Sequence, residues 1–174
     1  MEQSSRSLGI DIGSTTTKLV FMADGNIIYE KYQRHLSRAR QTALEMLREI
    51  EPLLREGPFT AAISGSAGLG IAEAAGIDFV QEVYATSEFI SRKAPDTSVI
   101  IELGGEDAKV VFYRGGVDQR MNGSCAGGTG AFIDQMAVLL DMSLEEMDRQ
   151  SLEATQIYPI ASRCGVFAKT DIQP

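Results

Sequence analysis

The chain contains no tryptophan, a single histidine and only two cysteines in 174 residues, and aromatic residues make up 7% of it. No apolar run approaches the ~20 residues that a membrane span requires, and the opening MEQSSRS does not form a signal segment. Basic residues are also scarce, since 16 Lys and Arg stand against 24 Asp and Glu for a net charge of −8. These absences predict a soluble, cytoplasmic protein with no membrane and no nucleic-acid partner.

One pattern occurs twice. IDIGSTTTKLVF begins at Ile10 and IELGGEDAKVVF begins at Ile101, which is an offset of 91 residues without a gap. Each copy reads as a strand, a tight loop and a second strand, and therefore predicts a hairpin with an acid at its bend. One such hairpin is common turn chemistry, but two in the same register favour nucleotide binding. Facing loops would offer backbone N–H groups, hydroxyls and carboxylates to a metal-chelated polyphosphate, and Asp11 and Glu102 fit a magnesium ion held through water.

The order of expected elements indicates a duplicated α/β domain with mixed sheets. Three strands over residues 7–32 precede a helix from Ser37 to about Arg55, which Pro52 kinks or ends. A short strand, a glycine-containing loop at residues 64–70 and two further helices complete a first domain, residues 1–96. The second domain, residues 97–174, looks incomplete because the chain ends as a helix develops. The loop at residues 64–70 either lines the cleft or merely connects a strand to a helix.

The two cysteines, Cys125 and Cys164, each lie in a loop just ahead of an expected helix. A helix N-terminus favours a thiolate and an anionic centre attached to it. Two small buried residues would be the ordinary interpretation. A disulfide does not suit a reducing compartment, and zinc prefers ligands closer in sequence. An iron–sulfur cluster needs four thiolates, which two chains together would supply.

Taken together, the motifs resemble a known family. LGIDIGSTTTK and IIELGGEDAKV resemble the two phosphate motifs of the superfamily of actin, sugar kinases and heat-shock chaperone ATPases, whose fold is a duplicated ribonuclease H-like domain. GSCAGGTGAF and SRCGVFAKTDIQP resemble the cluster motifs of the activators (activases) of 2-hydroxyacyl-CoA dehydratases and benzoyl-CoA reductases. The resemblance runs from Leu8 to Pro174.

The resemblance implies an ATPase that delivers a low-potential electron to a partner iron–sulfur reductase or acyl-CoA dehydratase. It implies a homodimer bridged by one 4Fe–4S cluster on Cys125 and Cys164, with ATP, ADP and Mg²⁺ as the other cofactors. The phosphate and magnesium residues implied by the motifs are Asp11, Gly13, Ser14, Thr15, Thr16, Lys18, Gly104, Gly105, Glu106 and Asp107. Closing on ATP would reorient the helices that follow the cysteines.

The second phosphate loop departs from the smaller activators, which usually read Asp-x-Gly-Gly-Gln-Asp there. Its glutamates, Glu102 and Glu106, resemble a branch of large multidomain activases whose partner is a double-cubane-type protein or an unassigned reductase. Either glutamate is a candidate for orienting the water that attacks ATP. The glycine-rich segment that holds the adenosine in this superfamily is missing, so weak ATP binding is expected.

Two other functions stay open. A sugar or small-molecule kinase would use the same scaffold with a substrate pocket and a base, and a regulatory ATPase-like module would use the repeat only as structure. Neither requires two matched cysteines. His35, among several arginines, is interpreted as part of a solvated basic face or a partner contact.

Overall fold

A computed structural model of the chain describes residues 5–113, 116–122, 125 and 127–173. It separates into two compact units, residues 1–96 and 97–174. Within the described residues, no helix has the length and apolar character needed to cross a membrane.

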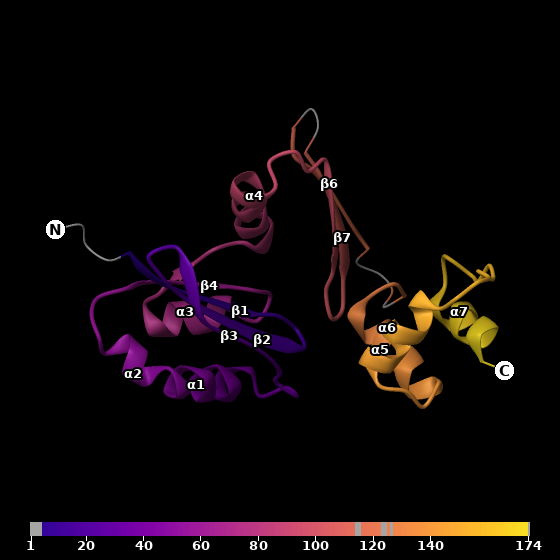
Figure 1. Cartoon of the computed structure of the whole chain (residues 1–174), viewed down its shortest axis with the longest axis horizontal. Helices are drawn as coiled ribbons and strands as arrows, with labels where there is room; N and C mark the ends of the chain where they lie inside the picture. The colour runs from indigo at the N-terminus through magenta and orange to yellow at the C-terminus, as the bar shows by residue number, and fades with distance from the viewer. Residues whose placement is uncertain (1–4, 114–115, 123–124, 126, 174) are drawn as a thin grey trace. The chain divides into compact units, whose positions relative to one another are not determined.

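Unit 1 is built on a five-stranded mixed sheet in the order β3-β2-β1-β4-β5 (Figure 1). The first three strands form an antiparallel meander, and the pairs β1–β4 and β4–β5 are parallel. Parallel neighbours need a crossover connection, which the helices between them supply. The strands are β1 (Arg6–Ile12), β2 (Thr16–Ala23), β3 (Asn26–Arg34), β4 (Thr60–Ser64) and β5 (Asp78–Phe79).

The helices of unit 1 are α1 (Ala39–Glu49), α2 (Glu51–Leu54), α3 (Leu69–Ala75) and α4 (Glu82–Lys93). Helices α1 and α2 run along one face of the sheet (Figure 1). Met46 and Ile50 bury their side chains against alternate residues of β1 and β2, including Ile10 and Phe21. The predicted kink is confirmed, because the helix breaks at Ile50 and restarts with Pro52 in the first turn of α2, where a missing N–H costs little.

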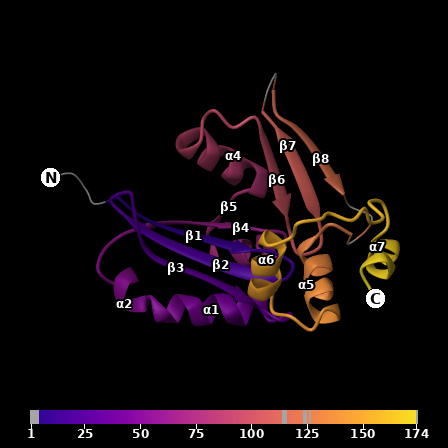
Figure 2. The ribbon, with the colours of Figure 1, turned by 45° about the vertical axis from the view of Figure 1, so that its right-hand side comes forward.

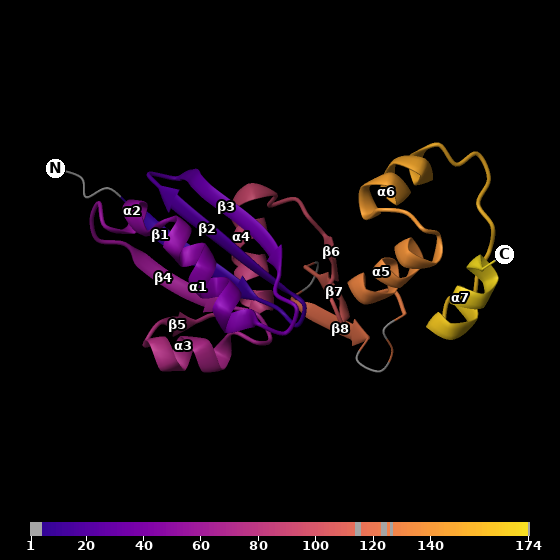
Figure 3. The ribbon, with the colours of Figure 1, turned by 90° about the horizontal axis from the view of Figure 1, so that it is seen from below.

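Unit 2 contains a three-stranded antiparallel sheet in the order β6-β7-β8, whose strands lie side by side in Figure 2. Figure 3 shows α5 beside α6, with α7 reached through a long connection. Ser143 caps α6 by accepting a hydrogen bond from the N–H of Glu146. The elements are β6 (Val99–Leu103), β7 (Ala108–Phe112), β8 (Asp118–Asn122), α5 (Gly130–Leu139), α6 (Leu144–Leu152) and α7 (Gly165–Ile172).

Both predicted hairpins are confirmed, as β1–β2 and β6–β7. Two strands were not predicted. β5 has only two residues, and β8 exposes every side chain, so neither carries the alternation of apolar and polar residues that identifies a strand in a sequence.

Candidate functional site

The first hairpin places an acid and a lysine directly opposite each other. Asp11 near the end of β1 pairs with Lys18 on β2, and Lys18 Nζ lies 2.6 Å from Asp11 Oδ2. The other carboxylate oxygen, Oδ1, is buried, and no hydrogen-bond partner reaches it among the described residues. A buried acceptor without a partner is costly, and a cation or an ordered water would relieve that cost. Asp11 therefore fits the outer coordination of a magnesium ion.

The loop between β1 and β2 turns on Gly13, whose N–H donates to the carbonyl of Thr16 at 2.9 Å. Ser14 and Thr15 at its tip are partly exposed, whereas Thr16 is buried. Three successive residues that follow Gly13, namely Ser14, Thr15 and Thr16, thus bring hydroxyl groups to the loop that follows Asp11. Such a concentration of donors suits a phosphate group.

His35 corrects the interpretation made from the sequence. It is 5% exposed and not part of a solvated basic face. Its ring Nε2 lies 3.0 Å from the carbonyl oxygen of Gly13, and its backbone N–H donates to the carbonyl of Thr15 at 3.1 Å. The residue follows β3, which brings it against the first loop. Sequence pattern misses it because this contact joins positions 22 residues apart.

The segment after β4 packs against the same hairpin. A Cβ atom on Gly65 would lie 2.2 Å from the carbonyl oxygen of Ile12 and 2.6 Å from Asp11 Oδ1. The N–H of Ala67 donates to that carbonyl of Ile12 at 2.9 Å. The glycine-containing loop is therefore both a connection from β4 to α3 and one wall around the Asp11 carboxylate.

The second hairpin repeats the cross-strand pair. Glu102 on β6 lies opposite Lys109 on β7, just as Asp11 lies opposite Lys18. Lys109 Nζ is 3.6 Å from Glu102 Oε1 and 3.2 Å from Asp107 Oδ2, so the lysine holds two carboxylates. A Cβ atom on Gly104 would lie 2.3 Å from Asp107 Oδ1, so a side chain there would displace the Asp107 carboxylate. Glu106 lies exposed in the bend beside Gly105.

Helix α5 is hydrogen-bonded to this second loop. The N–H of Gly130 donates to the carbonyl of Gly104 at 2.7 Å, and the N–H of Ala131 donates to that of Gly105 at 3.0 Å. The first N–H groups of a helix have no partner inside the helix. The loop therefore supplies the N-terminal cap of α5 and is joined to it by two backbone hydrogen bonds.

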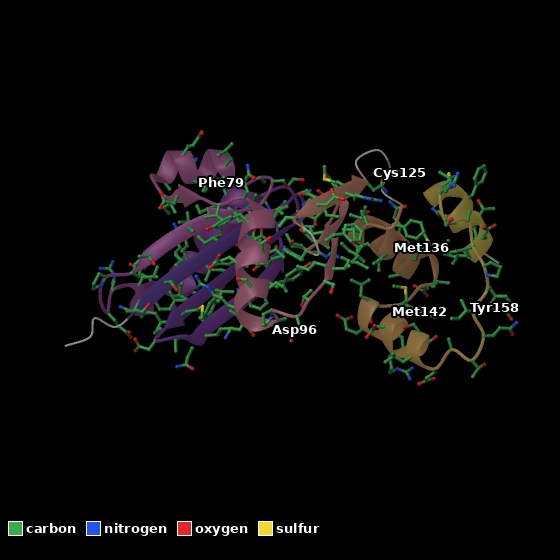
Figure 4. The ribbon with its side chains drawn as sticks, turned by 90° about the horizontal axis from the view of Figure 1, so that it is seen from above. Phe79, Asp96, Cys125, Met136, Met142 and Tyr158 are labelled. Atoms are coloured by element: carbon green, nitrogen blue, oxygen red, sulfur yellow. The ribbon has the colours of Figure 1, made fainter. Side chains whose placement is uncertain are left out.

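The structure brings the two cysteine motifs together at the start of α7. Cys164 is the residue that precedes α7, and its side chain is partly exposed. Cys125 is exposed in the loop that leads to α5 (Figure 4). Hydrogen bonds from the backbone of Gly127 and then of Gly165 lower the pKa of the Cys125 thiol. Because Gly165 follows Cys164 directly, the loop of Cys125 lies against the segment that carries Cys164.

The close approach at this site depends on glycine. A Cβ atom on Gly127 would lie 3.2 Å from the backbone nitrogen of Gly165 and 3.4 Å from Cys125 Sγ. The N–H of Gly127 donates to that sulfur at 3.3 Å. A side chain at either glycine would therefore require the neighbouring backbone to shift by a few tenths of an ångström.

Two polar residues that the sequence analysis did not select support these loops. Asn122 Nδ2 donates to the carbonyls of Cys125 and Gly127, at 3.1 and 3.3 Å. Asp171 on α7 accepts a hydrogen bond from the N–H of Ala161 at 2.9 Å and so fixes the segment before Cys164. Asn122 lies just ahead of the glycine-rich run, a position that could have marked it as a loop support.

The cysteine site is short of ligands for a metal cluster. The described residues contain no group of three or more His, Cys, Asp or Glu side chains able to hold a metal ion. The sequence has two cysteines in all. Two thiols, one of them already disposed to lose its proton, fit half of a four-thiolate iron–sulfur site.

Comparison with known proteins gives consistent matches. The model of the BadF/BadG/BcrA/BcrD ATPase family matches residues 8–173. The activator of lactoyl-CoA dehydratase from Anaerotignum propionicum is 33% identical over 172 residues, which cover 95% of this chain and 66% of that protein. The (R)-2-hydroxyglutaryl-CoA dehydratase activating ATPase from Acidaminococcus fermentans is 28% identical over 170 residues, 95% of this chain and 65% of that protein. The chain thus spans just under two thirds of the length of these relatives.

Two crystal structures match the fold closely. Component A of the Acidaminococcus fermentans (R)-2-hydroxyglutaryl-CoA dehydratase superposes with a TM-score of 0.82 at 26% identity, over 97% of this chain and 67% of that one. The activator of the 2-hydroxyisocaproyl-CoA dehydratase from Clostridium difficile, with bound ADPNP, superposes with a TM-score of 0.80 at 28% identity, over 95% and 63%.

Proposed function

The chain belongs to the BadF/BadG/BcrA/BcrD ATPase family and has its actin-like ATPase fold, and we propose that it activates a partner enzyme by ATP-driven delivery of a low-potential electron. The observation that carries this proposal is the meeting of Cys125 with the start of α7, beside Cys164. A kinase or a regulatory module has no use for two thiols held at one helix N-terminus. The backbone hydrogen bonds to Cys125 favour its thiolate. With the same pair from a second copy, the two cysteines would hold a 4Fe–4S cluster shared in a homodimer.

The two hairpins supply the groups that would bind Mg²⁺ and the phosphates of ATP. Asp11 has a buried oxygen without a partner among the described residues, and Lys18 neutralises the other oxygen. Magnesium bound there through water would place cationic charge beside the loop that starts at Gly13. Glu102 has the equivalent position in the second hairpin, and Glu106, being exposed, is free to orient an attacking water.

Nucleotide binding and the cysteine site are linked through α5. The carbonyls of Gly104 and Gly105 cap this helix, and Gly127, just before the helix, donates to Cys125 Sγ. A phosphate drawn to the N–H groups of the second loop would shift peptides that α5 must follow. The shift would reach the thiol over one short segment of backbone, and it would alter the hydrogen bonds and solvent exposure that set the potential of a bound cluster.

The partner proposed for this chain is an acyl-CoA dehydratase or an iron–sulfur reductase. The relatives named above are activators of dehydratases. Glu102 and Glu106 separate this chain from the loop usual in the smaller activators, and for that reason the reductase is retained as the second possibility.

Paired substitutions in the full-length protein test the proposal. Asp11→Asn should lower Mg²⁺-dependent ATP hydrolysis about tenfold or more and leave the iron content unchanged, because the carboxylate faces a cation and no thiol. Cys125→Ser should do the reverse, with loss of iron and of electron delivery but measurable ATP hydrolysis.

Iron, ATP hydrolysis and electron delivery are measured on both variants beside the parent protein after anaerobic purification. Electron delivery by Asp11→Asn at the parent rate would show that the first hairpin is only structural. Full iron content in Cys125→Ser would remove the thiol from the proposed cluster.

A further inference from the structure

We infer that His35 is a positioning residue for phosphate binding, because its ring fixes the peptide between Gly13 and Ser14. The inference rests on the proposed role of the first hairpin in binding nucleotide. His35 is the single histidine of the chain and lies buried beside this loop.

The hydrogen bonds of the ring select one tautomer. The carbonyl oxygen of Gly13 can only accept, so Nε2, 3.0 Å away, carries the proton. The N–H of Ser37 donates to Nδ1 at 3.1 Å, so Nδ1 has none. Both ring nitrogens are therefore used in hydrogen bonds.

The ring is held by an unusual turn. The N–H of Arg38 donates to the carbonyl of His35 at 2.8 Å, and the two residues between them, Leu36 and Ser37, have φ values of 48° and 64°. Two successive positive φ values are typical of a type I′ turn and are uncommon for residues other than glycine or asparagine. Such a backbone persists where its surroundings fix it, and here it aims the N–H of Ser37 at the ring.

Fixing the carbonyl of Gly13 also fixes the donor beside it. That C=O and the N–H of Ser14 belong to one planar trans peptide and point in opposite directions. The ring therefore turns the N–H of Ser14 away from His35. A phosphate bound at the loop would meet a donor whose direction is already set, so less ordering is needed on binding.

The second copy of the motif holds the same peptide by other means. Gly104 corresponds to Gly13 at the offset of 91 residues, and its carbonyl accepts the N–H of Gly130 at 2.7 Å. A helix terminus thus does in the second hairpin what the His35 ring does in the first. The equivalent carbonyl is thus held in both hairpins, by a different group in each. This indicates that both loops require this peptide in a fixed orientation.

Two substitutions separate this role from plain support of the turn. His35→Gln keeps an N–H donor close to the position of Nε2, and His35→Asn keeps an acceptor close to Nδ1 but cannot reach Gly13. In the full-length protein, we expect His35→Asn to weaken binding of Mg·ADP and Mg·ADPNP about tenfold by calorimetry. His35→Gln should stay within about threefold of the parent protein. A role confined to the turn predicts the opposite order and would overturn the inference.

Two further measurements keep the outcomes distinct. Asp11→Asn is titrated in parallel. If this variant binds Mg·ADP like the parent protein, the first hairpin does not bind nucleotide, and the inference about His35 is wrong as well. If Asp11→Asn weakens binding while His35→Asn does not, the inference alone fails. Should His35→Asn not fold, the ¹⁵N shifts of the ring in the parent protein decide. A proton on Nδ1 at neutral pH would contradict the clamp on Gly13, and a proton on Nε2 alone supports it.

Discussion

The carboxylate of Asp11 is confined on both sides. Lys18 Nζ lies 2.6 Å from Oδ2. On the other side, a Cβ atom on Gly65 would lie 2.6 Å from Oδ1. Gly65 also has a φ of +96°, which side chains other than glycine rarely adopt. The hydrogen atom that Gly65 has in place of a side chain therefore leaves room for the Asp11 carboxylate.

Gly65→Ala should destabilise the protein by about 2–3 kcal/mol, because the new methyl group would meet the carbonyl of Ile12 at 2.2 Å in a strained backbone. Urea denaturation measures the change. Gly70→Ala is the matched control, since no heavy atom lies within 4 Å of its Cβ position and it sits inside α3. It should stabilise by about 0.5–1 kcal/mol. Equal effects of the two substitutions would contradict the packing described around Asp11.

Helix α7 begins where the loop of Cys125 lies against Gly165, the residue after Cys164. Cys164 precedes it, and the backbone of its first residue, Gly165, donates to the sulfur of Cys125. Hydrogen bonds to the charged form and the positive end of the helix both favour a thiolate. The helix that acts on Cys125 is therefore α7, although in the sequence this cysteine precedes α5.

The pH dependence of alkylation tests this arrangement. The pKa of Cys125 is lowered by the hydrogen bonds from Gly127 and Gly165, so its thiolate persists to lower pH than that of an ordinary cysteine. The rate of reaction with iodoacetamide, followed by peptide mass spectrometry in iron-free protein, should reach half its maximum below pH ~8.5. Urea-unfolded protein provides the control and should return to that value. The same midpoint in folded and unfolded protein would contradict the hydrogen bonds to the sulfur.

Each chain has two cysteines, and a four-iron cluster takes four thiolates. A pair of chains related by a twofold axis satisfies this count with identical sites, because such an axis brings the same surface of both copies together. A shared cluster would therefore set the ratio of iron to chains as well as the ligands of the iron.

Anaerobic reconstitution of the full-length protein should give about four irons per two chains, all in the dimer. Iron and sulfide analysis combined with light scattering measures both quantities. The iron-free protein, as in an aerobic preparation, can be monomeric without contradiction. A full cluster on a strict monomer would rule out a cluster shared between chains.

Local patterns in the sequence determine much of this protein. Strand alternation and turn residues are set by near neighbours, and for this reason both hairpins follow from the sequence, whereas the cross-strand pairs of Asp11 with Lys18 and of Glu102 with Lys109 appear only in the structure. The helix break ahead of Pro52 follows for the same reason, because proline acts on the turn in which it stands. The four motifs together also identify the family.

Contacts between distant segments were decided only by the tertiary structure. Nothing in the periodicity around His35 indicates that it reaches Gly13, or that Gly65 presses on Asp11. The same holds for Gly127 against Gly165, a contact that brings two separate cysteine motifs next to each other. These close contacts between distant segments depend on how the strands and helices pack. They also depend on where a glycine, which has no side chain, leaves room for the neighbouring backbone. A periodic pattern predicts which face of a helix or strand is buried. It does not identify the residues that this face will contact.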